Sequence, residues 1–556
     1  MGKTGLTSLF RREFQGYNGR TFAQDALAGL TVTAVALPLA LAFGVASGAT
    51  ASAGLITAIV AGLVIGLLSG APYQISGPTG AMSAILILLV QKYGLPGVWV
   101  AGLISGAILL VLGLFKLGKM ISYIPSPVIT GFTSGIALII AIGQIDNFLG
   151  IATPGSESAA LKLFGYFKGG FAPDWHAAAF GAAVIAVMVL WPKKWQARFP
   201  SSLAAIVLVL AANALLNWTV PMVGDIPRTL LPQDRLVFSS IPWADLGDLA
   251  APAVTIAVLG MVESLLCGAV AGNMTGKPLQ ADQELIAQGV GNMLIPFLGG
   301  VPATAAIART SVGIKSGGQT RMVSVIHSVG LLASMFLLAP VMSRIPLSAL
   351  AGVLMVTAFR MNEWESIRFM MHKRFKAAIL AFAVTMVCTV ALDLTQAILV
   401  GVGVSAVLFL KSISDLEVQV LDVDPDRLRE KGIENAGRCR HAKVAYLTGP
   451  VFFAAVDSMN TALQHLDGSH TLILSMRGVP LLDICGLQAL VKLTERMQGS
   501  GCTLMLASVQ PQVMKMMERG GLLDMIQQEN IFWSADQAIV EAERRGCPCS
   551  QVALGA

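Results

Sequence analysis

Hydrophobic residues form long runs between about residues 26 and 411 of this 556-residue chain, and short polar stretches separate the runs. A helix needs about 20 apolar residues to cross the ~30 Å hydrocarbon core of a bilayer. The pattern therefore predicts a mainly α-helical protein that crosses the membrane many times. We expect fourteen segments, at residues 26–43, 52–70, 80–91, 97–115, 127–144, 176–192, 201–219, 251–271, 285–298, 304–314, 321–341, 346–359, 377–392 and 394–411.

Two of these segments, 80–91 and 304–314, are too short to cross the hydrocarbon core. Each begins at a similar Pro-containing motif, Ser76–Ala81 in one case and Val301–Ala306 in the other, and the two motifs lie about 220 residues apart. Paired short segments at matching places in two halves of a chain are typical of a transporter binding site near the membrane midplane.

The spacing of later motifs supports an internal repeat. Pro125 follows Pro78 by 47 residues, and Pro346 follows Pro302 by 44 residues. A polar, Pro-rich stretch at residues 221–248 separates the two sets of seven segments. Because seven is odd, the second set must enter the membrane from the opposite side, so we predict a seven-plus-seven inverted repeat.

The chain is predicted to have four parts. They are an N-terminal segment at 1–24, a transmembrane domain at 25–412 with repeats at about 25–220 and 250–412, a linker at 413–436, and a small domain at 437–548. If the N-terminus is cytoplasmic, the inner loops carry most of the loop Lys and Arg residues, as the positive-inside rule requires. We therefore expect a multi-pass protein of a bacterial plasma membrane, with both termini in the cytoplasm and no cleavable signal peptide.

The small domain reads as α/β. Short apolar runs at 444–447, 471–474 and 503–506 are typical of buried strands, and helical patterns at 458–466, 484–497 and 512–519 separate them. Strands that alternate with helices indicate a layered α/β domain. Five of the seven cysteines lie in this tail without framework spacing, which fits a reducing compartment.

Composition excludes several classes of function. Only 13% of residues are charged, against about 25% in soluble domains, and the mean hydropathy is +0.71. The sequence has no Walker loop, dinucleotide fingerprint, metalloprotease motif or nucleophile elbow, so we expect neither an enzyme nor a cofactor. The net charge of +6 reflects loop topology, and no basic stretch is interleaved with aromatic residues, so nucleic-acid binding has no support.

The two Pro motifs predict an anion site. Each precedes a short helix whose N-terminus carries unpaired N–H groups and about half a positive charge. In an inverted repeat these ends face each other from opposite sides, and Thr79 and Thr304 add hydroxyl donors. The alternative is that Pro and Gly only kink packed helices.

Two charged residues lie in predicted membrane segments. Glu263 would have to pair with a cation, bind one or take up a proton, since burying an ionised carboxylate is costly. It is therefore a candidate coupling site for H⁺ or Na⁺, or else a structural hydrogen-bonding group. Arg309 could balance Glu263, attract an anion, or extend its charge to the membrane interface. His327 and Asp393 are weaker candidates, His327 reading as a packing residue and Asp393 as an interface residue.

Several motifs together resemble the SulP (sulfate permease) family of anion transporters, and the resemblance covers nearly the whole chain. They are Ala36–Gly44, Ser76–Ala81, Glu263–Cys267, Gln283–Asn292 and Pro302–Thr310. The tail resembles the STAS domain that follows the membrane domain in this family, on the basis of Leu447–Phe453 and Leu482–Leu487.

The resemblance implies core and gate domains, an elevator-like movement and usually a homodimer in the lipid bilayer. It also implies a set of substrate-binding residues between the third and tenth segments. These are Phe43 in the anion pocket, Thr79, Gly80, Ala81, Thr304 and Ala305 at the helix ends, and Arg309 near the site.

Three positions depart from patterns in the family. Leu39 stands where some members have a Gln, which removes one polar contact. Cys267 stands where sodium-coupled bicarbonate members have Thr, and a thiol is a poor Na⁺ ligand. The chain is therefore most similar to the proton-coupled dicarboxylate-type bacterial members, and we expect proton coupling through Glu263. In the tail, Cys485 replaces the phosphoacceptor Ser of soluble STAS switches, so that switch is expected to be absent.

These observations predict secondary active transport of a small anion, with sulfate:proton symport as the first hypothesis. A C4-dicarboxylate or bicarbonate symporter is the nearest rival to it. Two hypotheses of a different kind are an uncoupled anion channel and a membrane regulator that signals through its STAS domain.

Overall fold

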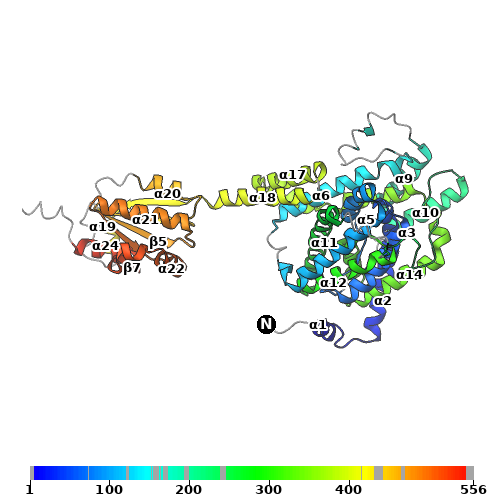
Figure 1. Cartoon of the computed structure of the whole chain (residues 1–556), viewed down its shortest axis with the longest axis horizontal. Coiled ribbons are helices and arrows are strands. Elements are labelled where there is room, and N and C mark those ends of the chain that lie inside the picture. Colours follow the sequence, from blue (N-terminus) through cyan, green and yellow to red (C-terminus); the bar gives the residue numbers. More distant parts are fainter. Residues whose placement is uncertain are drawn as a thin grey trace, which may run out of the picture. The chain divides into compact units, whose positions relative to one another are not determined.

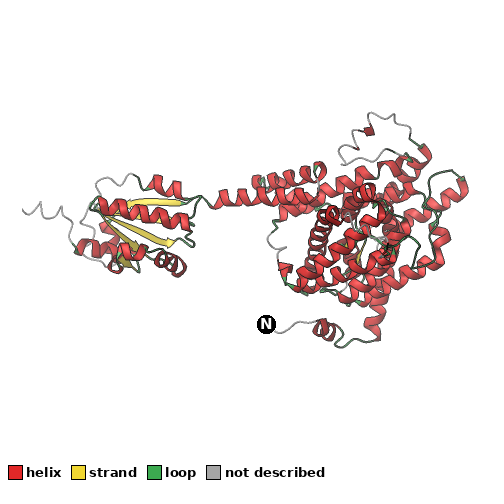
Figure 2. Cartoon of the chain, in the orientation of Figure 1, coloured by secondary structure: helices red, strands yellow, loops and turns green. Residues whose placement is uncertain are grey.

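The computed structural model describes residues 6–72, 74–119, 124–151, 153, 162, 165–166, 173–192, 200–237, 239, 246–392, 394–414, 416–430, 442–464 and 470–545. These residues form two compact units, Met1–Ser405 and Ala406–Ala556, which are described separately. Figure 1 labels the elements, and Figure 2 shows that helices make up most of the first unit while the larger sheet belongs to the second.

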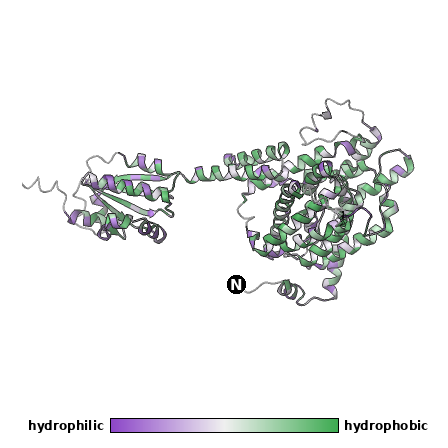
Figure 3. Ribbon diagram, viewed as in Figure 1, coloured by the Kyte–Doolittle hydropathy of each residue, from purple (hydrophilic) through white to green (hydrophobic). Residues whose placement is uncertain are grey.

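The first unit is built from apolar helices, which Figure 3 shows as mostly green ribbons. Among the described residues, seven spans are long and apolar enough to cross a membrane, and four shorter apolar helices accompany them. The helices are α1 (Leu6–Glu13), α2 (Gly19–Ala46), α3 (Ala51–Val60), η1 (Ala61–Ile65), α4 (Gly66–Leu68), α5 (Gly80–Leu114), α6 (Ser126–Gly143), α7 (Ile145–Leu149), α9 (Trp175–Leu190), α10 (Ser201–Leu216), α11 (Leu246–Thr275), α12 (Ala281–Leu294), η5 (Ile295–Leu298), α13 (Ile307–Lys315), α14 (Met322–Met342), α15 (Leu347–Met361), α16 (Trp364–His372), α17 (Lys376–Ala391) and α18 (Leu394–Ile413).

Each of the fourteen predicted segments coincides with helix, with two local differences. The third and fourth segments are joined in α5, which is interrupted at Gly94 (φ 67°, ψ −177°) shortly before Pro96. Glycine adopts positive φ at little steric cost, and proline cannot donate a helical hydrogen bond, so the direction changes here without a long loop. Residues 304–306, predicted as helix, are extended, and α13 begins only at Ile307.

A small antiparallel sheet joins the two halves of this unit. Strand β1 (Ser76–Gly77) pairs with β2 (Thr304–Ala305), so that Ser76 lies opposite Ala305 and Gly77 opposite Thr304. The amide of Ala306 extends the pairing by donating to the carbonyl of Ile75 at 2.9 Å. The two predicted breaks are thus hydrogen-bonded to each other. The sequence does not predict this pairing, because each strand has only two residues and therefore shows no periodicity.

Close backbone contact holds α12 against the second part of α5. A Cβ atom on Gly289 would lie 2.5 Å from the amide nitrogen of Leu110, and one on Gly106 would lie 2.7 Å from that of Met293. Only glycine permits this approach, as is common where helices pack within a membrane. The contact places the polar face of α12 beside the β1–β2 pair.

A buried ion pair ties the N-terminal helix to α14. The Nη2 and Nε atoms of Arg321 donate to Oε2 of Glu13 at 2.8 and 3.0 Å, and Nη1 donates to the carbonyl of Leu67 at 2.5 Å. The guanidinium also lies over the Phe10 ring, 4.2 Å from its centroid. The Arg321 side chain is 1% exposed and that of Glu13 is 5% exposed, so the pair is shielded from solvent.

The second unit is a five-stranded sheet with helices on both faces. Its strands, in the order β3-β4-β5-β6-β7, are Glu417–Asp422, Ala442–Thr448, Thr471–Gly478, Thr503–Ala507 and Ile531–Phe532. Only β3 and β4 are antiparallel. The helices are α19 (Pro425–Glu430), α20 (Val456–Ala462), α21 (Ile484–Gly499), α22 (Pro511–Arg519), α23 (Leu522–Ile526) and α24 (Ala535–Arg544).

The strands at 444–447, 471–474 and 503–506 are confirmed within β4, β5 and β6, and alternate residues of these strands pack on opposite faces. One face carries α20 to α23 and the other carries α19 and α24. Strands β3 and β7 are absent from the sequence prediction because β3 is a largely exposed edge and β7 has two residues. Helix α20 begins at Val456 and ends at Ala462.

We predict that Glu13→Ala destabilises the first unit by about 3–5 kcal/mol, since it leaves the Arg321 charge buried without its partner. Thermal unfolding of the detergent-solubilised protein measures the change. Arg12→Ala on the same helix removes an exposed charge and serves as the control. Equal melting temperatures for the two variants would contradict a stabilising role for the pair.

Candidate anion-binding site

The β1–β2 pair brings the two predicted threonines together over Glu263. The hydroxyl oxygens of Thr79 and Thr304 are 3.1 Å apart. Both hydroxyls donate to Oε2 of Glu263, at 2.9 Å from Thr79 and 2.5 Å from Thr304. Thr304 is fully buried and Thr79 nearly so, while Glu263 keeps part of its surface accessible. One carboxylate oxygen therefore holds both hydroxyl donors of the predicted site.

The first of the two short-segment helices begins at Gly80, where the sequence predicts its start. Thr79 is the N-cap of α5, and its side chain accepts a hydrogen bond from the amide of Met82 at 3.4 Å. The amides of Gly80 and Ala81 lie in the first turn of this helix, where N–H groups lack partners within the helix. They point the positive end of the helix dipole toward the region beside Phe43.

The second helix end differs from the prediction. Thr304 and Ala305 lie in β2 rather than at the start of the helix, and Ala306 is the N-cap of α13. The amide of Ala305 donates to Oγ of Ser264 at 3.2 Å, so it is already occupied. Strand pairing competes with helix formation here, and the first turn of α13 starts three residues later than Thr304.

Arg309 lies beside the site, at the chain break before α5. Its side chain is 1% exposed, so the alternative that it extends its charge to the membrane interface is wrong. Its Nη2 atom donates to the carbonyl of Pro78 at 2.7 Å, and Nη1 lies 2.6 Å from where a Cβ atom on Gly77 would be. Its Nε and Nη1 atoms have no partner in the part of the chain that the structure describes. Arg309 therefore braces the break before α5 and makes no direct contact with the Glu263 carboxylate.

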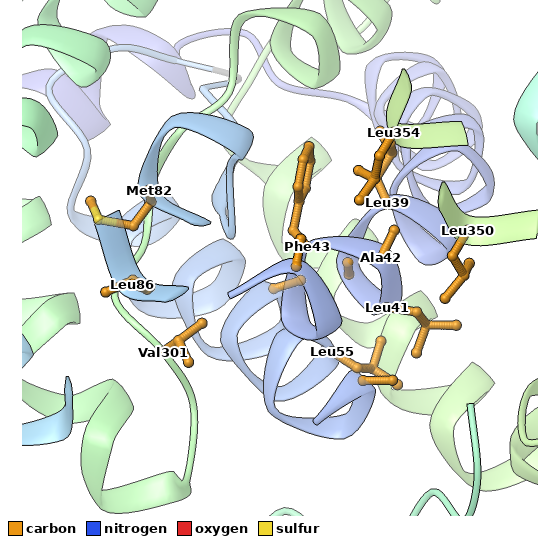
Figure 4. Close-up of a cluster of buried hydrophobic side chains, with 14 of the residues drawn as sticks. Leu39, Leu41, Ala42, Phe43, Leu55, Met82, Leu86, Val301, Leu350 and Leu354 are labelled. Atoms are coloured by element: carbon orange, nitrogen blue, oxygen red, sulfur yellow. The ribbon is translucent and has the colours of Figure 1, made fainter. Parts of the chain in front are cut away.

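Phe43 and Gly80 form the opposite wall of the site. A Cβ atom on Gly80 would meet Cε1 of Phe43 at 3.1 Å and Cδ1 of Ile140 at 2.4 Å. Figure 4 shows the Phe43 ring rising from α2 between Met82 of α5 and the pair formed by Leu39 and Leu354. The absence of a side chain on Gly80 lets Phe43 reach the N-terminus of α5.

A cavity of about 980 Å³ reaches this wall from the other side. Its lining includes Phe43 of α2, Ser83 of α5, Ile140 of α6 and Thr389 of α17. Charged residues line other parts of it, namely Lys92, Asp146, Lys162 and Asp248. Phe43 thus contacts both the cavity and the helix end, and the cavity is spacious enough for a small anion.

The remaining candidates do not join this cluster. His327 is fully buried, and neither ring nitrogen has a hydrogen-bond partner among the described residues. The Cys267 thiol donates to Oγ1 of Thr310 at 3.3 Å. Asp393 lies outside the described residues. Cys485 is exposed in the first turn of α21.

Sequence reasoning assigned no role to several buried polar residues behind the site. Ser264 contacts β2, and a group of polar side chains on α12 and the adjoining loop surrounds a second carboxylate, Glu284. The sequence feature that could have indicated them is the four-residue spacing of Glu284, Gln288 and Asn292 in an apolar helix. That spacing places all three side chains on one helix face.

The fold is that of a multi-pass membrane protein, and it brings the two chain breaks together beside Glu263 as a candidate site. The sulfate permease family model matches residues 22–385, and the STAS domain model matches residues 434–538. The chain therefore belongs to the sulfate permease family and carries a C-terminal STAS domain. Its seven-plus-seven inverted repeat is the arrangement of its structural neighbours, and its relatives are membrane transporters rather than enzymes.

Relatives and solved structures cover most of the chain. The chain is 34% identical to "Putative sulfate transporter YvdB" of Bacillus subtilis (strain 168), over 95% of this chain and 99% of the relative. It is 28% identical to the bicarbonate transporter BicA of Picosynechococcus sp., over 94% and 95%. The solved transmembrane domain of a cyanobacterial BicA covers 70% of this chain and 98% of its own, with 28% identity and a TM-score of 0.62. The SLC26A9 structure shares the fold over 94% of this chain and 90% of its own, with a TM-score of 0.81 and 19% identity.

We predict that Gly80→Ala raises the KM for the transported anion roughly tenfold, because the added methyl group must displace Phe43 and Ile140 at the helix end. A tenfold loss of affinity corresponds to about 1.4 kcal/mol of binding free energy. Uptake into proteoliposomes measures KM. Gly403→Ala is the control, since a Cβ atom there meets nothing within 4 Å. An unchanged KM for Gly80→Ala would place the anion away from this helix end.

Proposed function

We propose that this protein is a secondary active transporter that carries a small anion, sulfate first, together with protons. The observation that carries the proposal is the pair of Thr hydroxyls on one oxygen of Glu263, beside the first turn of α5. The names of its relatives support an inorganic oxyanion as the substrate.

The hydrogen bonds of Glu263 suggest how proton and anion binding are linked. An ionised Glu263 engages both hydroxyl donors and repels an arriving anion, by about 4 kcal/mol for charges ~4 Å apart at an effective dielectric constant of ~20. Protonation removes the repulsion and weakens the hold on Thr79 and Thr304, whose hydroxyls can then turn toward the anion. By thermodynamic reciprocity, the bound anion favours the protonated carboxyl to the same extent.

The side chain at position 267 argues against sodium coupling. The Cys267 thiol is engaged with Thr310, and it offers no hard oxygen ligand one helical turn from Glu263. Bicarbonate is the second candidate substrate because BicA is a relative over nearly the full chain. A helix-end site binds through backbone donors, which both anions can accept.

The setting of this transport is also part of the proposal. The protein lies in a bacterial plasma membrane as a homodimer, with its N-terminus and STAS domain in the cytoplasm. A core domain that carries the β1–β2 pair moves against a gate domain in an elevator-like cycle. Phe43 of α2 and Ile140 of α6, which both lie beside Gly80, would be located between the core and gate domains.

Transport assays in proteoliposomes test the substrate and the coupling ion. We expect radiolabelled sulfate to accumulate under a pH gradient with the acidic side outside, and not under a sodium gradient. Competition by excess unlabelled bicarbonate or succinate tests whether either is the preferred substrate. Uptake that follows sodium and ignores pH would overturn proton coupling, and a conductance far above carrier turnover would indicate a channel.

Replacing Glu263 by Gln should abolish accumulation under a pH gradient while anion exchange across the membrane continues. The amide keeps an oxygen for the two Thr hydroxyls but cannot take up a proton. Gradient-driven uptake and counterflow, measured on the same vesicles, separate the two effects. Glu365→Gln, an exposed acid-to-amide change, is the control, and unchanged accumulation in Glu263→Gln would remove this residue from the coupling mechanism.

A further inference from the structure

A ladder of polar side chains runs along one face of α12 behind the anion site. Its rungs are Glu284, Gln288 and Asn292, spaced four residues apart, and each is at most 2% exposed. Gln283–Asn292 is a motif that the proposed transport mechanism leaves without a role. Three buried polar groups on one helix face require partners, and those partners show what the ladder holds.

Glu284 accepts four hydrogen bonds, two on each oxygen. Ser69 Oγ and the Gly70 amide donate to Oε2 at 2.6 and 3.1 Å. The side-chain amides of Gln74 and Gln288 donate to Oε1 at 3.1 and 2.8 Å. Three of these partners are N–H groups, which can only donate, while the single proton of the Ser69 hydroxyl is shared between Glu284 and the carbonyl of Ala71, 2.9 Å away. No ion pair to Glu284 occurs among the described residues.

The side-chain amides of Gln74 and Gln288 connect Glu284 to residues of the site. Gln74 Nε2 also donates to the carbonyl of Ser264 at 2.9 Å, directly after Glu263 in the chain. Gln288 Nε2 also donates to Oγ of Ser76, in β1, at 2.9 Å. Each amide group therefore joins Glu284 to one part of the site.

The third rung holds the other strand. Asn292 donates to the carbonyl of Ala303 at 2.9 Å and accepts from the amide of the same residue at 2.7 Å. It acts as a strand partner for the residue just before β2. The three rungs contact β1 and the approach to β2 directly, and Gln74 connects Glu284 to the turn of α11 that carries Glu263.

The orientation of the two glutamines depends on the carboxylate. In the observed orientation the Oε1 atoms of Gln74 and Gln288 have no hydrogen-bond partner in the described part of the chain. A buried acceptor without a partner is costly, so a stronger interaction must fix each amide. The Glu284 carboxyl group supplies it, because its Oε1 atom accepts an N–H from Gln74 at 3.1 Å and from Gln288 at 2.8 Å.

We propose that Glu284 is a positioning residue for the anion site, acting through Gln74 and Gln288 on Ser264 and Ser76. It does not touch the anion. Its Oε1 atom fixes the direction of two amide groups, and these hold β1 and the Glu263 turn at the spacing that lets Thr79 and Thr304 meet. The inference deepens the proposed anion transport and rests on it for its functional readout.

Glu284→Gln tests the proposal with little change of shape. Its amide nitrogen takes the place of one carboxylate oxygen and faces N–H donors, so at least one neighbour must turn away. If Gln74 or Gln288 turns, Ser264 or Ser76 loses its donor. We expect the KM for sulfate in proteoliposomes to rise at least tenfold while the maximal rate changes less than threefold.

Gln283→Leu is the matched control, because Gln283 lies on the same helix and donates only to the carbonyl of Leu68. Its KM should match that of the unmodified protein. A role limited to folding would lower the yield and the maximal rate of Glu284→Gln without raising KM, and that result would overturn the proposal. If Glu284→Gln does not fold, Gln288→Met removes the Ser76 contact and keeps the carboxylate, and an unchanged KM would then count against the ladder.

Amide hydrogen exchange gives a readout that does not depend on the substrate. In detergent, Glu284→Gln should speed exchange at least tenfold at residues 75–80 and 303–306, while α14 and α15 keep their protection. If the unmodified protein transports neither sulfate nor bicarbonate, the proposed function fails and this measurement still decides the ladder. Unchanged exchange at both strands would overturn it.

Discussion

Extended backbone within a membrane protein must find its hydrogen bonds inside the protein, because the hydrocarbon core offers none. This constraint governs the first unit. The breaks before α5 and α13 leave peptide groups that no helix satisfies, and the chain satisfies them by pairing β1 with β2. Side chains satisfy other peptide groups near the breaks. The Thr57 hydroxyl forms hydrogen bonds with both the amide and the carbonyl of Val301, and the Asn292 side chain does the same for Ala303.

The same pairing creates the site. The register that sets Gly77 opposite Thr304 also brings the hydroxyls of Thr79 and Thr304 within hydrogen-bonding distance of each other. Glu263 then lies where both can donate to it. A structural requirement of the backbone thus places a titratable group beside a helix N-terminus.

Two buried acidic side chains, Glu13 and Glu284, support this arrangement in different ways. Arg321 and Glu13 compensate each other directly and hold the N-terminal helix in place. Glu284 lacks a cation within the described residues and relies on four hydrogen bonds instead. The Arg321–Glu13 ion pair acts locally, whereas the hydrogen-bond network of the polar ladder reaches β1 and the residue before β2. Both follow the rule that a buried charge must be paired or fully hydrogen-bonded.

Much of the site could be predicted because the internal repeat produces matching Pro motifs in the two halves of the sequence. The paired Pro motifs located Thr79 and Thr304, and Glu263 stood out as a carboxylate in an apolar run. The start of α13 was predicted wrongly because strand pairing across more than 200 residues overrides local helix preference. The direction of Arg309, the neighbours of Phe43 and the partners of Glu284 depend on contacts between distant segments, which a single sequence does not encode in any local pattern.

The sequence by itself determined the membrane class, the fourteen segments, the inverted repeat, the α/β tail and the family. These follow from hydropathy and motif spacing. Both can be identified in a sequence without knowing how the helices pack. Only the tertiary structure decided that the two breaks form one sheet, that Glu263 binds both threonines, and that α12 carries the polar ladder. Hydrogen bonds act over about 3 Å, so which groups they join is settled when the helices pack.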